Sequence, residues 1–151
     1  MANPEHLALA RNGSKSINAF ASQTPRVALD LTGADLTEMD LRDCDLQEGN
    51  LAGVNLTGAD LRNARLGGAN LEGAILRDAD ARGTGLHRAN LQGADFRGIK
   101  MDPIGTGHQL MCMSPKTFAN ARWDRERLEE IMNALNLNRD WQIRYEILPK
   151  G

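Results

Sequence analysis

The residue types that most often carry chemistry, histidine and cysteine, are few and scattered in this sequence. Its three histidines are His6, His87 and His108, and none stands in an HExxH motif. The two cysteines are Cys44 and Cys112, and no Cys-x-x-Cys pair occurs. No serine lies in the Gly-x-Ser-x-Gly context of a hydrolase nucleophile. We therefore expect no catalytic residue, no metal and no cofactor, and hence a protein that is not an enzyme.

Two short segments near the carboxyl terminus could hold a ligand on residue type alone. The Met-Cys-Met segment at 111–113 carries soft sulfur atoms that suit Cu(I), although such residues also pack in hydrophobic cores. The Gly-Thr-Gly segment at 105–107 lacks the lysine of a phosphate-binding loop, and we interpret it as a turn. Cys44 and Cys112 are expected to be separate buried thiols in a reducing compartment, because only the first lies in the repeat region.

Charged side chains recur at a regular spacing, which suggests a function for them outside catalysis. Aspartate at 40, 60 and 80 and arginine at 42, 62 and 82 each stand twenty residues apart. Such adjacent columns either neutralise one another or form a docking strip for a charged partner. With two aromatic residues near the carboxyl terminus, they make up the candidate interaction surface: Asp40, Arg42, Asp60, Arg62, Asp80, Arg82, Trp141 and Tyr145.

A leucine repeat determines where these charges stand. From Leu31 onward, leucine or another apolar residue occupies every fifth position up to Phe96, with Met101 as a final candidate. On an α-helix, a spacing of five would scatter the leucines around the cylinder, and on a straight strand it would alternate them between faces. All of them can point into one core only if the chain turns a corner once per repeat. The pattern therefore predicts a β-solenoid.

Longer columns indicate how many corners close one coil. Gly33, Gly53, Gly73 and Gly93 are twenty residues apart, which gives four corners per coil and about three and a half to four coils. The smaller residue two positions before each leucine, usually alanine, should share the interior. Ile75 stands where other repeats have Asp or Asn, and we expect its side chain to face water. The predicted core consists of Leu31, Leu36, Leu41, Leu46, Leu51, Leu56, Leu61, Leu66, Leu71, Leu76, Leu86, Leu91 and Phe96.

Several repeats resemble the A-(D/N)-L-x-x signature of pentapeptide repeat proteins. Examples are Gly-Ala-Asp-Leu at 33–36, Gly-Ala-Asp-Leu-Arg at 58–62, Gly-Ala-Asn-Leu at 68–71 and Gly-Ala-Asp-Phe at 93–96. The resemblance covers about half of the chain and implies a right-handed quadrilateral β-helix. It also implies a non-enzymatic scaffold that binds an unidentified protein partner. An alternative comes from gyrase-protecting members of the family, which mimic a DNA duplex and modulate a type II topoisomerase.

The segments on either side of the repeats are expected to cap the solenoid. Residues 1–28 should form an amino-terminal cap with one helix over 3–21, and 29–101 the solenoid itself. Residues 102–151 should form a strand-helix-strand extension, with a helix near 115–135 and a strand near 141–148. The aromatic residues of that last strand either complete the cap or pair with a partner. A homodimer through this extension is implied by the resemblance.

Composition limits the remaining classes of function. The 151 residues include 18 basic and 20 acidic ones, and this balance argues against direct nucleic-acid binding. Nowhere do 18 apolar residues run together, and the first residues lack the basic and apolar regions of a secretory signal. We therefore expect a soluble, cytoplasmic protein with no membrane span.

Overall fold

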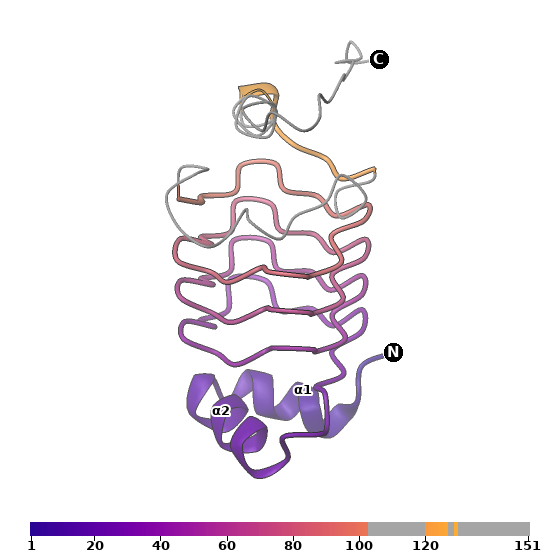
Figure 1. Cartoon of the computed structure of the whole chain (residues 1–151), viewed down its shortest axis with the longest axis vertical. Coiled ribbons are helices and arrows are strands. Elements are labelled where there is room, and N and C mark those ends of the chain that lie inside the picture. The colour runs from indigo at the N-terminus through magenta and orange to yellow at the C-terminus, as the bar shows by residue number, and fades with distance from the viewer. Residues whose placement is uncertain (103–119, 127–128, 130–151) are drawn as a thin grey trace.

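The repeat region forms a stack of coils (Figure 1). The coils wind around an apolar core. The computed structural model describes residues 1–102, 120–126 and 129. Isolated parallel β-bridges join positions twenty residues apart, as in Asp40 to Asp60 and Asp60 to Asp80. We name residues 29–48, 49–68 and 69–88 the first, second and third coils, and the fourth begins at residue 89. Each coil has four corners, so that the stack presents four sides.

Backbone hydrogen bonds between coils follow a fixed register. The N–H of a leucine-position residue donates to the carbonyl nineteen residues ahead, as in Leu51 to Asn70 at 2.8 Å. The N–H of the preceding residue donates to the carbonyl twenty-one residues back, as in Asn70 to Gly49 at 2.9 Å. Each coil therefore needs acceptors from both neighbours, and the two ends of the stack need substitutes.

The interior is filled by the residues that the repeat places inward. All thirteen residues of the predicted core are 1% exposed or less. The smaller inward position is crowded as well: a Cβ on Gly49 would come within 3.0 Å of the Leu46 carbonyl oxygen and of the Leu51 side chain. Burying each leucine contributes about 1.5–3 kcal/mol, which makes this axis the main source of stability. Ile75 is 36% exposed, as its position in the repeat predicted.

Each described corner has a residue with positive φ, and the first coil differs from the others there. In the second to fourth coils this position is mostly glycine, whereas Glu38, Asp43 and Glu48 occupy it in the first coil with φ of 57°, 58° and 56°. A left-handed conformation costs roughly 1–2 kcal/mol for a residue with a Cβ. The first coil thus carries acidic side chains where glycine would fit without strain.

Two helices lie across the amino-terminal end of the stack, which is the lower end in Figure 1. The sequence had predicted a single helix there. Helix α1 spans Pro4–Arg11 and helix α2 spans Ser14–Gln23. The break falls at Gly13, whose φ of 82° is incompatible with a continuous α-helix. The prediction of one helix over 3–21 was therefore wrong. Ala10 and Ile17 are fully buried and join the core of the solenoid.

The ladder resumes beyond residue 102, where the sequence had predicted a helix. Arg122 forms a β-bridge with Asp95, and its N–H donates to the carbonyl of Ala94 at 2.8 Å. Trp123 stacks on Phe96, with ring centroids 4.3 Å apart. Residues 121–124 are not helical, so that the predicted helix near 115–135 was wrong over this part. Bridging to the fourth coil takes precedence over helical periodicity at this point.

Several other predictions fall outside the described residues. These are residues 115–119, 127, 128 and 130–135 of the predicted helix, the strand near 141–148 with Trp141 and Tyr145, and the segment around Cys112. Residues 125, 126 and 129 are described and are helical, as the sequence predicted. In the described part of the chain, no helix is both long enough and apolar enough to span a membrane.

Candidate functional site

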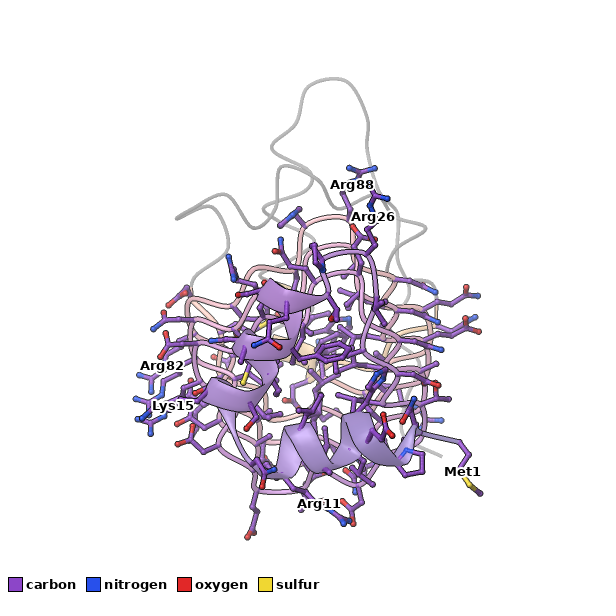
Figure 2. The ribbon with its side chains drawn as sticks, turned by 90° about the horizontal axis from the view of Figure 1, so that it is seen from below. Met1, Arg11, Lys15, Arg26, Arg82 and Arg88 are labelled. Atoms are coloured by element: carbon purple, nitrogen blue, oxygen red, sulfur yellow. The ribbon has the colours of Figure 1, made fainter. Side chains whose placement is uncertain are left out.

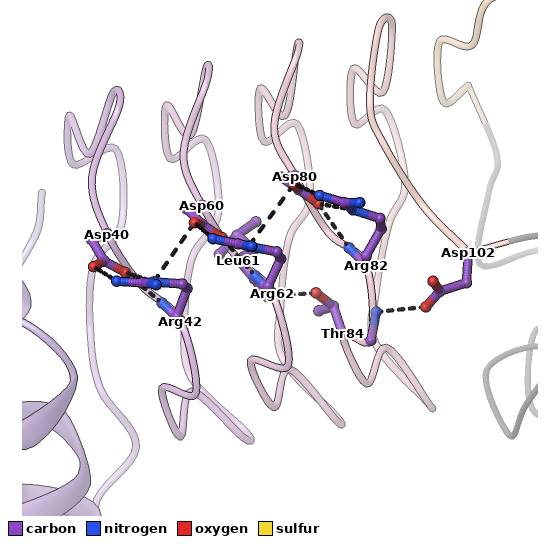
Figure 3. A network of polar contacts seen from close by, with 10 residues as sticks. Asp40, Arg42, Asp60, Leu61, Arg62, Asp80, Arg82, Thr84 and Asp102 are labelled. Atoms are coloured by element: carbon purple, nitrogen blue, oxygen red, sulfur yellow. Dashed lines mark hydrogen bonds and ion pairs between the residues drawn. The ribbon is translucent and has the colours of Figure 1, made fainter.

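The six charged residues of the repeated Asp and Arg columns lie on one side of the solenoid, in three parallel rungs (Figure 3). We call Asp40, Arg42, Asp60, Arg62, Asp80 and Arg82 the Asp–Arg strip. In the middle rung, Asp60 Oδ1 accepts from the Arg62 backbone N–H at 3.2 Å and from Nε at 2.8 Å, and Oδ2 accepts from Nη2 at 2.6 Å. The Asp40–Arg42 and Asp80–Arg82 rungs repeat this geometry. Each arginine thus clasps its own aspartate with two side-chain nitrogens.

Neighbouring rungs are also in electrostatic contact. Arg42 Nε lies 3.7 Å from Asp60 Oδ2, and Arg62 Nε lies 4.0 Å from Asp80 Oδ2. Positive and negative groups therefore alternate up the strip. The strip remains accessible, because the arginine side chains are 41–54% exposed. The charges of the strip thus neutralise one another, and the strip is also accessible from the solvent.

Hydrogen bonding fixes the charge of these groups. The Arg42 side chain and backbone N–H lower the pKa of Asp40 to about 2, and Arg82 lowers the pKa of Asp80 to about 2. The pKa of Asp60 is lowered by its bond from Arg62. The same contacts raise the pKa values of the three arginines. Every rung therefore stays doubly ionised at neutral pH.

The strip ends with a rung of reversed charge order. Lys100 pairs with Asp80 in the ladder, at the position that aspartate holds below, and Asp102 follows where arginine would be expected. The Asp102 carboxylate accepts the N–H of Gly83 at 2.6 Å. In the register of the stack, this N–H would otherwise bond to the carbonyl of residue 102. A side-chain carboxylate thus replaces a backbone acceptor.

A second Asp–Arg cluster, which the sequence analysis had not singled out, lies on another side. Asp95 is only 5% exposed and accepts from two arginines: Arg97 through Nε at 2.8 Å and Nη2 at 2.6 Å, and Arg77 through Nε at 2.8 Å. Arg97, and then Arg77, hold the pKa of Asp95 far below its usual range. The spacing of Asp95 and Arg97 equals that of the strip rungs, and this signal could have identified the pair.

Other polar and sulfur groups of the solenoid have structural surroundings. The Thr84 hydroxyl is buried and donates to the Leu61 carbonyl at 2.6 Å, so that this polar side chain has a hydrogen-bond partner inside an irregular repeat. Burial raises the pKa of the Cys44 thiol to about 12, so that it stays protonated and unreactive. In the described ranges, no group of three His, Cys, Asp or Glu side chains is arranged to hold a metal ion.

The regular register, the leucine axis and the A-(D/N)-L pattern all point to one family. A model described as "Pentapeptide repeats (8 copies)" matches residues 29–63 and 59–98. The chain belongs to the pentapeptide repeat family. The predicted right-handed β-helical solenoid is thereby confirmed.

Solved structures of pentapeptide repeat proteins are similar to this chain. HetL from the cyanobacterium Nostoc sp. PCC 7120, described as involved in heterocyst differentiation regulation, is 25% identical over 60% of this chain and 38% of its own, with a TM-score of 0.37. Rfr23 from the cyanobacterium Cyanothece 51142 is 28% identical over 60% of this chain and 57% of its own, with a TM-score of 0.31.

A third similar structure is full-length QnrB1, described as a plasmid-mediated fluoroquinolone resistance protein. It is 14% identical over 67% of this chain and 65% of its own, with a TM-score of 0.36. This chain therefore spans less than two thirds of each of the three proteins. A search of curated protein sequences finds no match.

Proposed function

We propose that this pentapeptide repeat protein is a non-enzymatic scaffold for protein–protein interaction, and that the Asp–Arg strip is its docking surface. One observation carries the proposal: the six side chains of the strip hold one another in fixed positions while the arginines stay exposed. A partner that binds such a surface immobilises few free rotamers, which lowers the entropic cost of association. The alternating charges would also fix the register of the partner along the stack.

A residue-specific cross-linking experiment tests this docking surface. A photoreactive amino acid would replace exposed Asn63, beside the strip, or exposed Gln92, on another side of the solenoid. We expect one discrete protein adduct in the source cell from position 63 and none from position 92. The adduct should disappear when Arg42, Arg62 and Arg82 are all changed to alanine.

A matched triple variant controls for the three substitutions. Thr32→Ala, Glu72→Ala and Gln92→Ala change the same number of outward positions in another column and should leave the adduct intact. Equal adducts from positions 63 and 92, or an adduct that survives loss of the three arginines, would exclude the strip as the docking surface.

The DNA-mimic alternative requires a broadly negative surface, and the charge distribution does not supply it. Residues 29–48 contain seven acidic residues and one basic residue, whereas residues 49–102 contain six acidic and seven basic ones. Negative charge is thus concentrated in a single coil. Inhibition of gyrase-catalysed supercoiling by the purified protein, undiminished in the triple arginine variant, would favour duplex mimicry over the scaffold.

The sequence also predicted a homodimer through the carboxy-terminal extension and a cytoplasmic location, and both stay predictions. Light scattering on the intact chain and on a Trp141→Ala, Tyr145→Ala variant tests the first. A dimer that becomes monomeric in the variant would support it, and an unchanged mass would contradict it. Fractionation of the source cell tests the second.

A further inference from the structure

A cleft of about 490 Å³ lies at the lower end of the solenoid, away from the Asp–Arg strip. One wall is the chain segment 24–29 that leads from helix α2 into the first coil. The other wall is the side of the first coil that contains residues 45, 47 and 48. This volume falls in the range of about 300–1,000 Å³ that is typical of ligand sites. Figure 2, which looks at this end, shows Arg26 projecting on the same side as Arg88 of the third coil.

The cleft exists because one hydrogen-bonding step of the stack is missing. The register predicts that the N–H groups of Arg26 and Ala28 donate to the carbonyls nineteen residues ahead, those of Asp45 and Gln47. Neither bond forms, and among the described residues neither N–H has another partner. The normal register begins only with the bond from the Asn50 N–H to the Leu29 carbonyl, at 2.7 Å. Two facing backbone edges are therefore left open, one with donors and one with acceptors.

Open backbone edges are the groups that bind an added strand. In β-augmentation, main-chain hydrogen bonds supply affinity and pockets for alternate side chains supply specificity. The cleft offers both, because Phe20 and Val27 provide apolar surface next to the open edges. Val27 is 52% exposed and, with Met1 and Ile75, is one of three exposed large apolar side chains among the described residues. Burying Val27 under a bound strand would remove that surface from water.

Charge determines which strand fits. The first coil, which forms one wall, contains seven acidic residues and one basic residue. Of these charged residues, Asp45 and Glu48 line the cleft, and Arg26 lies on the opposite wall. Asp45 is engaged by Arg65 at 2.8 Å, but exposed Glu48 forms no ion pair within the described part of the chain. Glu48 also has a φ of 56°, at a corner where Gly68 stands in the coil above. An acidic wall of this kind attracts a basic ligand.

From these features we infer that the cleft binds an extended segment of a partner protein in which apolar and basic residues alternate. The backbone of the segment bonds to the edges left open at residues 26, 28, 45 and 47. Its apolar side chains contact Val27 and Phe20, and its basic side chains face Glu48. This surface is separate from the Asp–Arg strip, so that either site can fail its test without affecting the other.

The test measures binding of a defined probe to the full-length protein by fluorescence anisotropy. The probe is a fluorescein-labelled, acetylated hexapeptide in which lysine and valine alternate. We expect saturable binding. Two comparison peptides should bind at least about tenfold more weakly: one with every backbone amide N-methylated, which lacks backbone donors, and one with glutamate in place of lysine.

Protein variants then locate the site. Val27→Asp and Glu48→Arg should each weaken binding about tenfold. Arginine is tolerated at the second position, because Arg88 occupies the same corner two coils above with a φ of 61°. The matched control Glu38→Arg makes the same charge change at a left-handed corner of the same coil, outside the cleft, and should weaken binding less than about threefold. Circular dichroism would verify that all three variants are folded.

Three results would overturn the inference. The first is absence of saturable binding by the lysine–valine peptide. The second is equal binding of the N-methylated peptide, which would show that backbone bonds are not used. The third is equal weakening by Glu48→Arg and Glu38→Arg, which would reduce the effect to the overall charge of the first coil.

Discussion

At both ends of the solenoid, side chains replace the backbone acceptors that a neighbouring coil would provide, but the two ends use different side chains. At the lower end, the Asp30 N–H donates to His6 Nδ1 at 2.9 Å, and the Asp45 N–H donates to Asn18 Oδ1 at 2.7 Å. At the upper end, the acceptors for the N–H groups of Gly83 and Gly98 are the carboxylates of Asp102 and Asp124. Neutral groups thus serve as acceptors for these N–H groups at the lower end, and anionic groups do so in described parts of the upper end.

Local charge accounts for this difference. The lower helices cover the first coil, which has seven acidic residues and one basic residue, and a carboxylate acceptor there would add to like charge. The fourth coil provides Arg97 and Lys100 near its edge, so that a carboxylate is favourable. The comparison indicates that the acceptor type at each end follows the charge of the coil that it covers.

A substitution in the middle of the stack should have the largest effect on stability, and it is the reference for the variants at both ends. Leu61→Asp places an unpaired carboxylate on the apolar axis and should prevent folding, because burying the charge costs several kcal/mol or more. Far-ultraviolet circular dichroism and thermal unfolding measure this. Asn63→Asp is the control, since it adds the same charge at an exposed corner where Asp43 stands in the coil below. Cooperative unfolding of Leu61→Asp at the normal temperature would contradict the inward placement of Leu61.

The upper end can be tested through its aromatic contact. Trp123→Ala removes the ring that stacks on Phe96 and should lower the free energy of unfolding by about 2 kcal/mol, as for a partly buried aromatic residue. Trp123→Leu restores the usual residue of the repeat and should recover most of that loss. Urea unfolding measures both. If leucine is no better than alanine, Trp123 does not serve as a core residue of a further repeat.

Exchanging neutral and charged acceptors at the two ends tests whether local charge determines the acceptor type. Asn18→Asp keeps the acceptor for the Asp45 N–H, but it loses the donor to the Asp43 carbonyl and adds a negative charge. We expect a loss of about 1–2 kcal/mol in the free energy of unfolding. Asp102→Asn keeps an acceptor for Gly83 and should cost only about 0.5–1 kcal/mol.

Two further variants complete that exchange. Lys15 is exposed on the same helix as Asn18. The Lys15→Ala variant therefore controls for substitution in α2, and we expect little change in its free energy of unfolding. A larger loss from Asp102→Asn than from Asn18→Asp, measured by urea unfolding at neutral pH, would contradict the explanation by local charge.

The period of the repeat determined which parts of the fold could be predicted. A leucine every fifth residue has one physical solution, and this is why the core and the side of the Asp–Arg strip followed from the sequence. The pairing of Asp60 with Arg62 could be inferred in outline, but the clasp by Nε and Nη2 depends on rotamers that spacing does not define. The open edge at Arg26 and Ala28 could not be predicted either, because it depends on how α2 leads into the first coil.

The errors occurred where two patterns competed. Helical spacing across residues 3–21 suggested one helix, although Gly13 interrupts it with positive φ. Near the other end, apolar spacing suggested a helix through Trp123. The local order Asn-Ala-Arg-Trp at 120–123 instead matches Asn-Ala-Arg-Leu at 63–66, and both segments begin with an asparagine at positive φ. That short match was the signal for a further repeat, and it outweighs the helical pattern because it brings backbone bonds to the fourth coil.

The smallest expected effect distinguishes the exposed rungs from the enclosed Asp95 cluster through pH. A carboxyl group whose pKa is lowered by folding stabilises the protein above its unfolded pKa of about 4, and this contribution disappears as the pH falls through the folded value. Arg97→Gln removes the main cause of the lowered pKa of Asp95, so that the variant should be less stable than the parent at pH 5 and approach it under strongly acidic conditions. Arg42→Gln should show the same trend, weakly, between about pH 4 and 2, because the Asp40–Arg42 pair is exposed to water. Urea unfolding at pH 5, 3 and 2 measures both differences. A loss for Arg42→Gln as large as that for Arg97→Gln would show that the strip stabilises the fold, and not only its surface pattern.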